Sequence, residues 1–275
     1  VNSHSYNMTL PHGRVAHQTI LVLDFGSQYT QLIARRLREL SVYSEIVSHS
    51  ISASEIERRQ PQGIIFSGGP ASLSEVGAPT CDPEVFELDV PILGICYGMQ
   101  LLTKQYGGLV GGAAEREYGP ATVSVTARGG VDGILKNVPG DFKVWASHGD
   151  FIREAPLGFD VVAKSPNAPV AAMADAERDR YGLLFHPEVV HTDHGATILK
   201  NFTELCECRG DWTMSSFVDE ATELIRNTVG REGRVVCGLS GGVDSTVAAV
   251  LIHRAIGDRL TCIFVDNGLL RLDER

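Results

Sequence analysis

The alternation of predicted strands and helices is the feature of this sequence that most strongly restricts its fold. Between Thr19 and Tyr106, short runs typical of buried strands are followed by turns and by stretches with helical spacing. The predicted strands are Thr19–Leu23, Tyr43–Val47, Gly63–Phe66 and Pro91–Ile95. Parallel strands need a crossover connection, so this alternation favours an open, mostly parallel sheet flanked by helices. We therefore expect an α/β fold.

The pattern changes after Ala121. Several short candidate strands then follow one another without long helices between them. They are Thr122–Thr126, Phe142–Ala146, Asp160–Ala163 and Tyr181–Phe185. Such a series is typical of antiparallel or mixed pairing. A helix is expected from about Gly195 to Glu207, and it closes a first domain that spans residues 18–208.

A second α/β segment follows a linker near Cys208. Its predicted elements are a helix at Ser216–Thr228, a strand at Arg234–Gly238, a helix from Asp244 and a strand at Leu260–Val265. A parallel sheet needs more strands than these to bury its helices, so we expect residues 209–275 to be the N-terminal part of an incomplete domain. Residues 1–17 are polar and are predicted to form a flexible extension.

Composition excludes several classes of function. The 275 residues carry a formal net charge of −10 without a long Lys/Arg block, which argues against nucleic acid or an anionic membrane as the main partner. No apolar run approaches the ~18 residues that a membrane span needs. The six cysteines match neither a disulfide framework nor a CxxC zinc pair. We expect reduced thiols in a cytoplasmic protein.

The strongest local motif is Gly94-Ile95-Cys96-Tyr97-Gly98, which stands between a predicted strand and a predicted helix. It has the form of a nucleophile elbow, with cysteine as the nucleophile. Glycines allow the sharp turn, and the turn places the sulfur at a helix N-terminus, where the dipole and free N–H groups favour a thiolate. A buried, inert cysteine in a turn is the alternative interpretation.

Two further motifs favour the catalytic interpretation. His186-Pro187-Glu188 follows another predicted strand, so the imidazole of His186 can act as a base that the Glu188 carboxylate orients. The loop Ser67–Pro70 also follows a strand and is rich in glycine. The backbone N–H groups of Gly69 and Tyr97 are candidate donors to an oxyanion. All of these groups are expected at the carboxyl edge of one sheet.

These motifs resemble those of the class I glutamine amidotransferases, which use a Cys-His-Glu triad. The resemblance rests on Ser67–Pro70, Gly94–Gln100 and His186–Val189, and extends from about Thr19 to Cys208. It implies hydrolysis of the glutamine side-chain amide to glutamate and ammonia through a thioester on Cys96, without a cofactor. It also implies that glutamine is held by Gln100 and by the backbone near Ser147 and His148.

A second glycine-rich motif lies between the predicted strand Arg234–Gly238 and the helix that follows it. Its residues are Ser240, Gly241, Gly242, Val243, Asp244 and Ser245. Backbone N–H and hydroxyl groups at a helix N-terminus favour binding of a phosphate. The lysine of the GxxxxGK[ST] loop is missing, so a kinase-like transfer is not expected.

This motif is similar to the signature of the ATP pyrophosphatase family, which cleaves ATP to AMP and pyrophosphate. The resemblance implies that residues 240–245 and Val265 bind ATP and that Asp244 contributes to binding of Mg²⁺. A glycine-rich helix start without a ligand is the alternative.

A triad amidotransferase upstream of such a loop resembles the family of glutamine-hydrolysing GMP synthetases. Shorter strings agree, at Leu23–Tyr29, Arg116–Gly119, Ser147–Asp150 and Gly210–Thr213. The resemblance implies that XMP, ATP and glutamine give GMP, AMP, pyrophosphate and glutamate, in a full-length protein that is a homodimer. We expect these 275 residues to supply the glutaminase half and not to make GMP alone.

Two other functions stay open from the sequence. A stand-alone or differently coupled glutaminase would need no nucleotide loop, so the motif at Ser240–Ser245 argues against it. A non-catalytic module with this fold would not need Cys96, His186 and Glu188 together.

Several weaker features receive plain structural interpretations. His191 and His194 lack enough partners for a metal site and are expected in a polar loop. The pairs Arg35-Arg36 and Arg58-Arg59 are expected on solvated helix faces.

Overall fold

The chain forms two compact units, which divide between Asp211 and Trp212. The computed structural model describes residues 17–128 and 133–264, and the side chains of all of these except 113–116 and 216. The predicted flexible extension at 1–17 therefore lies almost wholly outside the described residues, and so does Val265. Each unit is described by itself.

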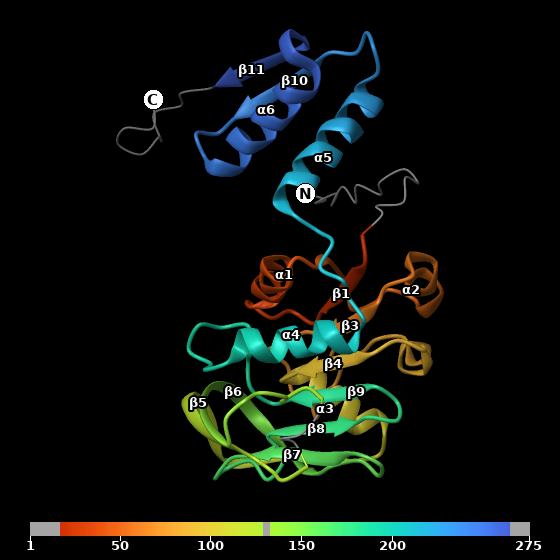
Figure 1. The fold of residues 1–275 in the computed structure, drawn as a ribbon. Helices are drawn as coiled ribbons and strands as arrows, with labels where there is room; N and C mark the ends of the chain where they lie inside the picture. The colour runs from red at the N-terminus through yellow and green to blue at the C-terminus, as the bar shows by residue number, and fades with distance from the viewer. Residues whose placement is uncertain (1–16, 129–132, 265–275) are drawn as a thin grey trace. The chain divides into compact units, whose positions relative to one another are not determined.

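The first unit contains a nine-stranded sheet with the order β2-β1-β3-β4-β9-β8-β7-β5-β6 (Figure 1). Its parallel half consists of β1 (Thr19–Asp24), β2 (Tyr43–Ser48), β3 (Gly63–Phe66), β4 (Ile92–Ile95) and β9 (Arg180–Leu183). These strands coincide closely with the predicted apolar runs. The prediction of an α/β fold with a mostly parallel start is confirmed.

The other half of the sheet is antiparallel. It consists of β5 (Leu109–Val125), β6 (Asp141–Glu154), β7 (Asp160–Lys164) and β8 (Ala172–Asp175). The change of pairing predicted after Ala121 is therefore confirmed. The sequence-based prediction did not include β8, and the strands that it gave for β5 and β6 were too short.

Helices cover both faces of the parallel half. They are α1 (Thr30–Glu39), α2 (Ala53–Arg59), α3 (Tyr97–Gln105) and α4 (Gly195–Leu205), with a short 3-10 helix at Pro83–Glu87. Successive residues of a strand point to opposite faces. Accordingly, Val22 packs with Ile33 of α1 and Leu199 of α4, in one buried cluster. Leu23 packs in a second cluster, which also holds Ile56 of α2 and Leu102 of α3.

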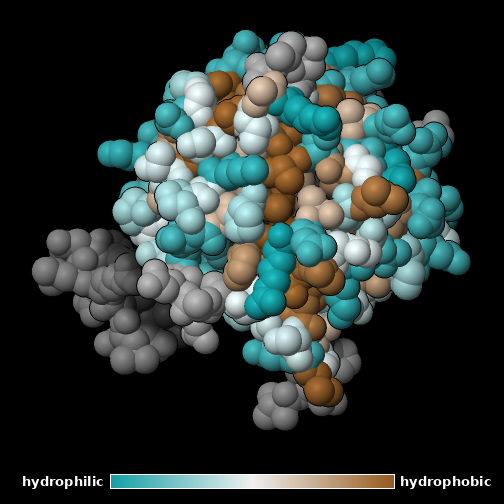
Figure 2. Space-filling model, turned by 90° about the horizontal axis from the view of Figure 1, so that it is seen from below, coloured by the Kyte–Doolittle hydropathy of each residue, from teal (hydrophilic) through white to brown (hydrophobic). Residues whose placement is uncertain are grey.

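The exterior of the first unit is mixed. Figure 2 shows a face on which hydrophilic side chains predominate and a narrow apolar stripe runs between them. Folded domains normally keep some apolar surface of this kind. Among the described residues, no helix combines the length and the apolar character required to cross a bilayer.

The second unit begins the βαβ pattern that the sequence predicts. Its elements are α5 (Met214–Val229), β10 (Val235–Leu239), α6 (Val243–Ile256), a 3-10 helix at Gly257–Arg259, and β11 (Leu260–Phe264). The strands β10 and β11 pair in parallel, with Cys237 opposite Cys262. The described part of this unit contains only this two-stranded sheet.

Candidate active site

Cys96 lies in the sharp turn between β4 and α3. Its backbone has φ 52° and ψ −105°, a conformation that a residue with a side chain rarely adopts. The turn is fixed on both sides, because the Cys96 N–H donates to the Leu183 carbonyl at 2.7 Å and the Gln100 N–H donates to the Cys96 carbonyl at 3.1 Å. Strain of this kind persists where the surrounding structure imposes it, and it is concentrated at functional sites.

Two glycines make this turn possible. A Cβ at Gly94 would lie 2.5 Å from the carbonyl carbon of Gly98, and a Cβ at Gly98 would lie 2.5 Å from the carbonyl oxygen of Phe66. Real Cβ atoms do not approach backbone atoms this closely. The first turn of α3 therefore packs directly on β3 and β4, and the position of the Cys96 sulfur follows from that contact.

His186 and Glu188 form a buried pair beside Cys96. The His186 Nδ1 and Glu188 Oε1 atoms are 2.7 Å apart, and both side chains are almost fully buried. The C-terminal end of β9 delivers them, and the His186 N–H donates to the Trp145 carbonyl at 3.1 Å. A carboxylate on Nδ1 leaves Nε2 as the ring nitrogen available for a proton transfer.

The charge state of His186 reflects its neighbours. Burial is the largest influence and by itself lowers the pKa of the imidazole, but hydrogen bonds to Cys96 and Glu188 and the negative charges of these groups raise it. The result is a pKa of about 10. A histidine that interacts in this way with both a cysteine and a carboxylate can exchange a proton with the thiol.

We expect Glu188→Gln to lower the pKa of His186. The carboxylate raises this pKa by stabilising the imidazolium, so an uncharged amide in the same place favours the neutral ring. The expected fall is roughly one to three pH units, the range for an opposite charge at this distance. NMR titration of the His186 ring signals measures it, with His49 as an internal reference. An unchanged midpoint in the variant would contradict this account of the pair.

The other cysteines differ from Cys96 in their surroundings. Burial raises the pKa of the Cys81 thiol to about 12, that of Cys208 to about 11, and that of Cys206 well above its ordinary value. Thiolates at these positions are therefore rare at neutral pH. Cys237 and Cys262 belong to the second unit.

The loop after β3 lies against the pair. A Cβ at Gly68 would meet the His186 Cε1 atom at 3.0 Å and the Cys96 Cβ atom at 3.6 Å. The Ser67 hydroxyl accepts from the Phe25 N–H at 2.9 Å, which ties this loop to the end of β1. Gly69 also packs on Phe25, since a Cβ there would lie 2.7 Å from the Phe25 carbonyl oxygen.

The two predicted oxyanion donors belong to two different segments, the first turn of α3 and the loop after β3. Tyr97 is the first residue of α3, so its N–H has no partner within the helix. Gly69 is in the neighbouring loop that Ser67 anchors.

The predicted glutamine-binding residues lie on α3 and β6. The Gln100 side chain is buried and donates to the Asp150 carbonyl at 3.4 Å, while its Oε1 atom has no partner among the described residues. The Cys96 Sγ atom is 3.5 Å from the Ser147 carbonyl oxygen, which places the main chain of β6 beside the sulfur. An unpaired buried amide oxygen is costly, so Gln100 is suited to accept from a ligand.

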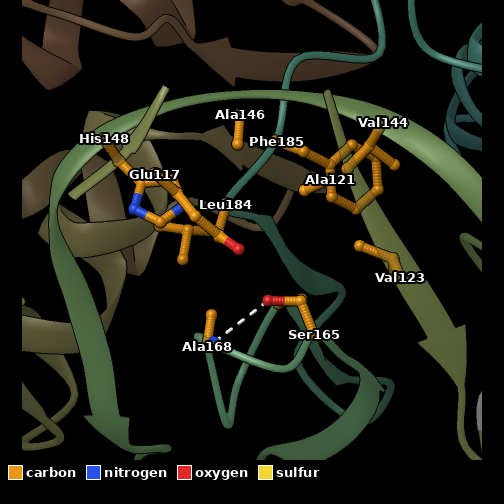
Figure 3. A pocket seen from close by; sticks show the side chains of 11 residues that line it. Glu117, Ala121, Val123, Val144, Ala146, His148, Ser165, Ala168, Leu184 and Phe185 are labelled. Atoms are coloured by element: carbon orange, nitrogen blue, oxygen red, sulfur yellow. Dashed lines mark hydrogen bonds and ion pairs between the residues drawn. The ribbon is translucent and has the colours of Figure 1, made fainter. Parts of the chain in front are cut away.

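The His148 side chain lines a small cavity of about 10 Å³ (Figure 3). Its Nε2 atom is 3.3 Å from Glu117 Oε2. Burial is the largest influence on the pKa of His148 and lowers it; the Glu117 carboxylate opposes that shift, and the charge of His186 adds to it. Gln100 and His148 therefore both have a side-chain contact within the protein, Gln100 with the Asp150 carbonyl and His148 with the Glu117 carboxylate.

Three residues at the site have a role that was not predicted. The Tyr29 ring packs edge-on against the His186 ring, with 5.1 Å between centroids. The Thr192 hydroxyl donates to the His186 carbonyl at 2.6 Å. The Arg36 Nε atom donates to the Glu188 carbonyl at 3.0 Å. No motif assigns these residues such contacts, and only the fold brings them to the pair.

The prediction that both arginine pairs lie on solvated faces was wrong for one member of each. Arg36 reaches the triad segment and is 26% exposed, and Arg59 bridges Glu45 and Glu55. Helix spacing alone could not show that an adjacent loop or strand meets these side chains.

The two histidines after Glu188, His191 and His194, lie in the segment that leads to α4. His191 packs on Trp145 with 4.8 Å between ring centroids, and His194 precedes α4 with φ 59°. Within residues 17–128 and 133–264, no group of His, Cys, Asp and Glu is arranged to hold a metal ion.

The second motif forms an exposed turn between β10 and α6. Gly241 has φ 81°, and Gly242 precedes the helix. The Ser240 and Ser245 hydroxyl oxygens are 3.1 Å apart, and the Ser245 hydroxyl donates to the Gly242 carbonyl at 3.1 Å. These contacts fold the loop over the N-terminus of α6, where anions bind favourably. Asp244 is exposed in the first turn.

Comparison with protein-family models identifies the first unit. Residues 21–205 match the model of class-I glutamine amidotransferases. The chain belongs to this family. Residues 217–265 match the NAD synthase model, which agrees with a nucleotide-type loop at the start of α6. The amidotransferase match covers β1 to α4, and so includes Cys96, His186 and Glu188.

Similar amidotransferases include two proteins named glutamine-hydrolyzing GMP synthase. The one from Staphylococcus carnosus is 55% identical over 258 residues, which are 94% of this chain and 49% of that protein. The one from Geobacillus kaustophilus is 56% identical over 259 residues, 94% of this chain and 50% of that protein. The chain thus spans about half the length of the curated relatives it matches.

Among solved structures, this amidotransferase resembles a Thermoplasma acidophilum protein that is provisionally named as one subunit of a GMP synthase. The two are 33% identical, with a TM-score of 0.63. The match covers 70% of this chain and 94% of the other. The shared region is therefore the amidotransferase unit.

Proposed function

We propose that the first unit hydrolyses glutamine with Cys96 as nucleophile, His186 as base and acid, and Glu188 as the group that orients the imidazole. The observation that carries the proposal is the buried His186–Glu188 pair, 2.7 Å apart, beside a cysteine held in a strained turn. A base oriented by a carboxylate and hydrogen-bonded to a nucleophile is the arrangement used for acyl transfer.

The reaction follows from these groups. The Cys96 thiolate attacks the side-chain carbonyl carbon of glutamine and forms a tetrahedral oxyanion. Its collapse breaks the C–N bond, and His186 gives its proton to the departing ammonia. Water, deprotonated by His186, then attacks the resulting thioester, so that glutamate leaves and Cys96 is regenerated. No cofactor is needed, because the chemistry consists of acyl and proton transfers.

Backbone N–H groups are proposed to stabilise the negative charge of the tetrahedral oxyanion. We assign the N–H groups of Gly69 and Tyr97 to the oxyanion, since Tyr97 follows the nucleophile at the helix N-terminus and Gly69 belongs to the loop whose Gly68 lies close to Cys96 and His186. Gln100, with its unpaired buried oxygen, is assigned to the substrate together with the main chain of Ser147 and His148.

The second unit is proposed as the start of an ATP-binding domain. The turn at Ser240–Ser245 offers hydroxyl and N–H groups at a helix N-terminus, which suits a polyphosphate. Asp244 would contribute one carboxylate to Mg²⁺, an ion that proteins commonly hold with one or two carboxylates and the phosphates of the substrate. The ion would supply charge neutralisation at the phosphates. Val265 lies outside the described residues and is kept as a sequence-based assignment.

For the longer protein, we propose that ammonia from the first unit aminates XMP activated by ATP, giving GMP, AMP and pyrophosphate. This proposal rests on the relatives named GMP synthase. We also propose a homodimer and a cytoplasmic location, the latter because all six cysteines are free. The alternative is a glutaminase that supplies ammonia to another synthetase, and the nucleotide-type loop argues against it.

A pair of substitutions in a full-length protein separates the two activities. Cys96→Ala is expected to abolish GMP formation from glutamine but to retain it from added ammonium, since the second reaction does not need the thiol. Asp244→Asn is expected to reduce both by about tenfold or more, the usual cost of weakening a metal site. The measurement is GMP formation with each nitrogen source. If Cys96→Ala still uses glutamine, the proposed nucleophile is wrong; if no nitrogen source gives GMP in the wild type, the alternative function holds.

A further inference from the structure

The main chain of the triad segment is held by side chains from two other parts of the fold. His186 to Glu188 follow β9 but belong to no strand or helix themselves. Their carbonyl groups are buried and so need partners. We propose that Thr192 and Arg36 are positioning residues, which set the geometry of the catalytic pair by binding the carbonyls of His186 and Glu188. This inference rests on the proposed function and adds two residues to its machinery.

Thr192 joins the triad segment to the antiparallel half of the sheet. Its hydroxyl donates to the His186 carbonyl at 2.6 Å and accepts from the Trp145 N–H at 2.9 Å. The Trp145 carbonyl in turn accepts from the His186 N–H at 3.1 Å. Both main-chain polar groups of His186 are therefore linked to Trp145 of β6. The N–H group binds the Trp145 carbonyl directly, and the carbonyl group is linked to the Trp145 N–H through the Thr192 hydroxyl. Since β6 also presents Ser147 to the sulfur, it fixes both sides of the site.

Arg36 joins the same segment to α1. Its Nε atom donates to the Glu188 carbonyl at 3.0 Å, and its Nη1 atom is held by Glu39 Oε2 at 2.7 Å. The adjacent Arg35 also pairs with Glu39 but does not reach the triad segment. Exposure separates the two, because Arg35 is 74% exposed and Arg36 is 26% exposed. Arg36 is therefore the more enclosed of the two side chains.

Close packing makes the two anchors sufficient. A Cβ at Gly195 would overlap the Pro187 carbonyl, so the start of α4 packs directly against the segment. The triad segment is then fixed at three successive residues: His186 by Thr192, Pro187 by Gly195, and Glu188 by Arg36. Catalytic groups tolerate little displacement, and an error of about 1 Å costs up to about a hundredfold in rate.

Paired variants test the inference. Thr192→Val removes the hydroxyl with little change of shape, and Thr192→Ser restores it. Arg36→Met removes the donor, and Arg35→Met is its matched control because it disturbs the same Glu39. Thr203→Val controls for loss of a buried hydroxyl elsewhere, since Thr203 donates only within α4. Cys96→Ala is measured in parallel.

Two measurements are made on each variant. The first is glutamate release, separated into kcat and KM. The second is the pH profile of Cys96 alkylation by iodoacetamide, read on the Cys96 peptide by mass spectrometry. Alkylation reports the coupling of the thiol to His186 and needs no turnover, so it decides the inference even where glutamate release is slow.

We expect Thr192→Val and Arg36→Met each to lower kcat about tenfold with little change in KM, and to shift the alkylation profile. Thr192→Ser, Arg35→Met and Thr203→Val are expected to match the wild type. Wild-type kcat and profile in both Thr192→Val and Arg36→Met would overturn the inference, and so would equal losses in Arg35→Met and Arg36→Met. If Cys96→Ala remains as active as the wild type, the proposed function itself fails.

Discussion

Cys96→Ala is expected to reduce glutamate release from glutamine by at least about ten-thousandfold, the scale on which nucleophile removal acts in triad enzymes. Without the sulfur no thioester forms, and the remaining oxyanion donors and base cannot replace covalent catalysis. Release of glutamate by the purified chain, measured beside the variant, gives the ratio.

The matched control for this substitution is Cys81→Ala. Cys81 is also buried, but burial raises the pKa of its thiol to about 12. Its replacement is expected to leave the rate unchanged. Equal rates in the wild type and in Cys96→Ala would mean that another group performs the hydrolysis.

Gly98→Ala is expected to destabilise the first unit by roughly 3 kcal/mol, at the upper end of the cost of overpacking a core. Alanine normally favours a helix over glycine by about 1 kcal/mol, so propensity alone predicts the opposite sign. The clash decides, because the new Cβ would lie 2.5 Å from the Phe66 carbonyl oxygen. Relief of that clash is expected to move α3 away from β3 and to displace Cys96 from its position beside His186.

Urea unfolding of the Gly98→Ala protein measures the loss of stability, and Cys96 alkylation measures the displacement. Gly140→Ala is the control, since that glycine is exposed and a Cβ there meets nothing within 4 Å. It is expected to change stability by less than about 0.5 kcal/mol, as for other surface substitutions. A Gly98→Ala protein as stable as the wild type would show that α3 is not held by this contact.

The parallel half of the sheet could be predicted because its strands are buried on both faces. Such strands have nearly continuous apolar runs, as in Gly63–Phe66 and Ile92–Ile95, and the motifs at their ends mark the carboxyl edge. The elbow at Cys96 was predicted for the same reason, since a strand-end cysteine in a G-x-C-x-G pattern has the form of a nucleophile elbow.

The antiparallel half was less predictable. β5 extends from Leu109 to Val125, but Gly111, Gly119 and Pro120 interrupt any strand pattern, and the strand exists because β6 pairs with it across a bulge. β8, at Ala172–Asp175, is too short for a periodic signal and is defined by its neighbours β7 and β9. Pairing partners distant in sequence determine both elements.

The supporting residues of the site show the same limit. Arg36 meets Glu188 across a separation of 152 residues, and no pattern in the sequence links the two. Tyr29 and Thr192 contact His186 from loops, and no sequence pattern in these loops predicts the contact. Chemistry-bearing residues have recognisable neighbours in sequence, whereas the residues that position them are selected by the fold. The sequence therefore predicted Cys96, His186 and Glu188 as a triad but not the residues that position them.

The central claim is that Cys96 carries the glutamyl group as a thioester. The most direct test is an acid quench of the protein during reaction with glutamine, followed by mass spectrometry of the cysteine-containing peptides. We predict a glutamyl adduct on the Cys96 peptide, absent without glutamine and absent from Cys96→Ala. Glutamate production with Cys96 unmodified and the adduct on another cysteine would contradict the claim.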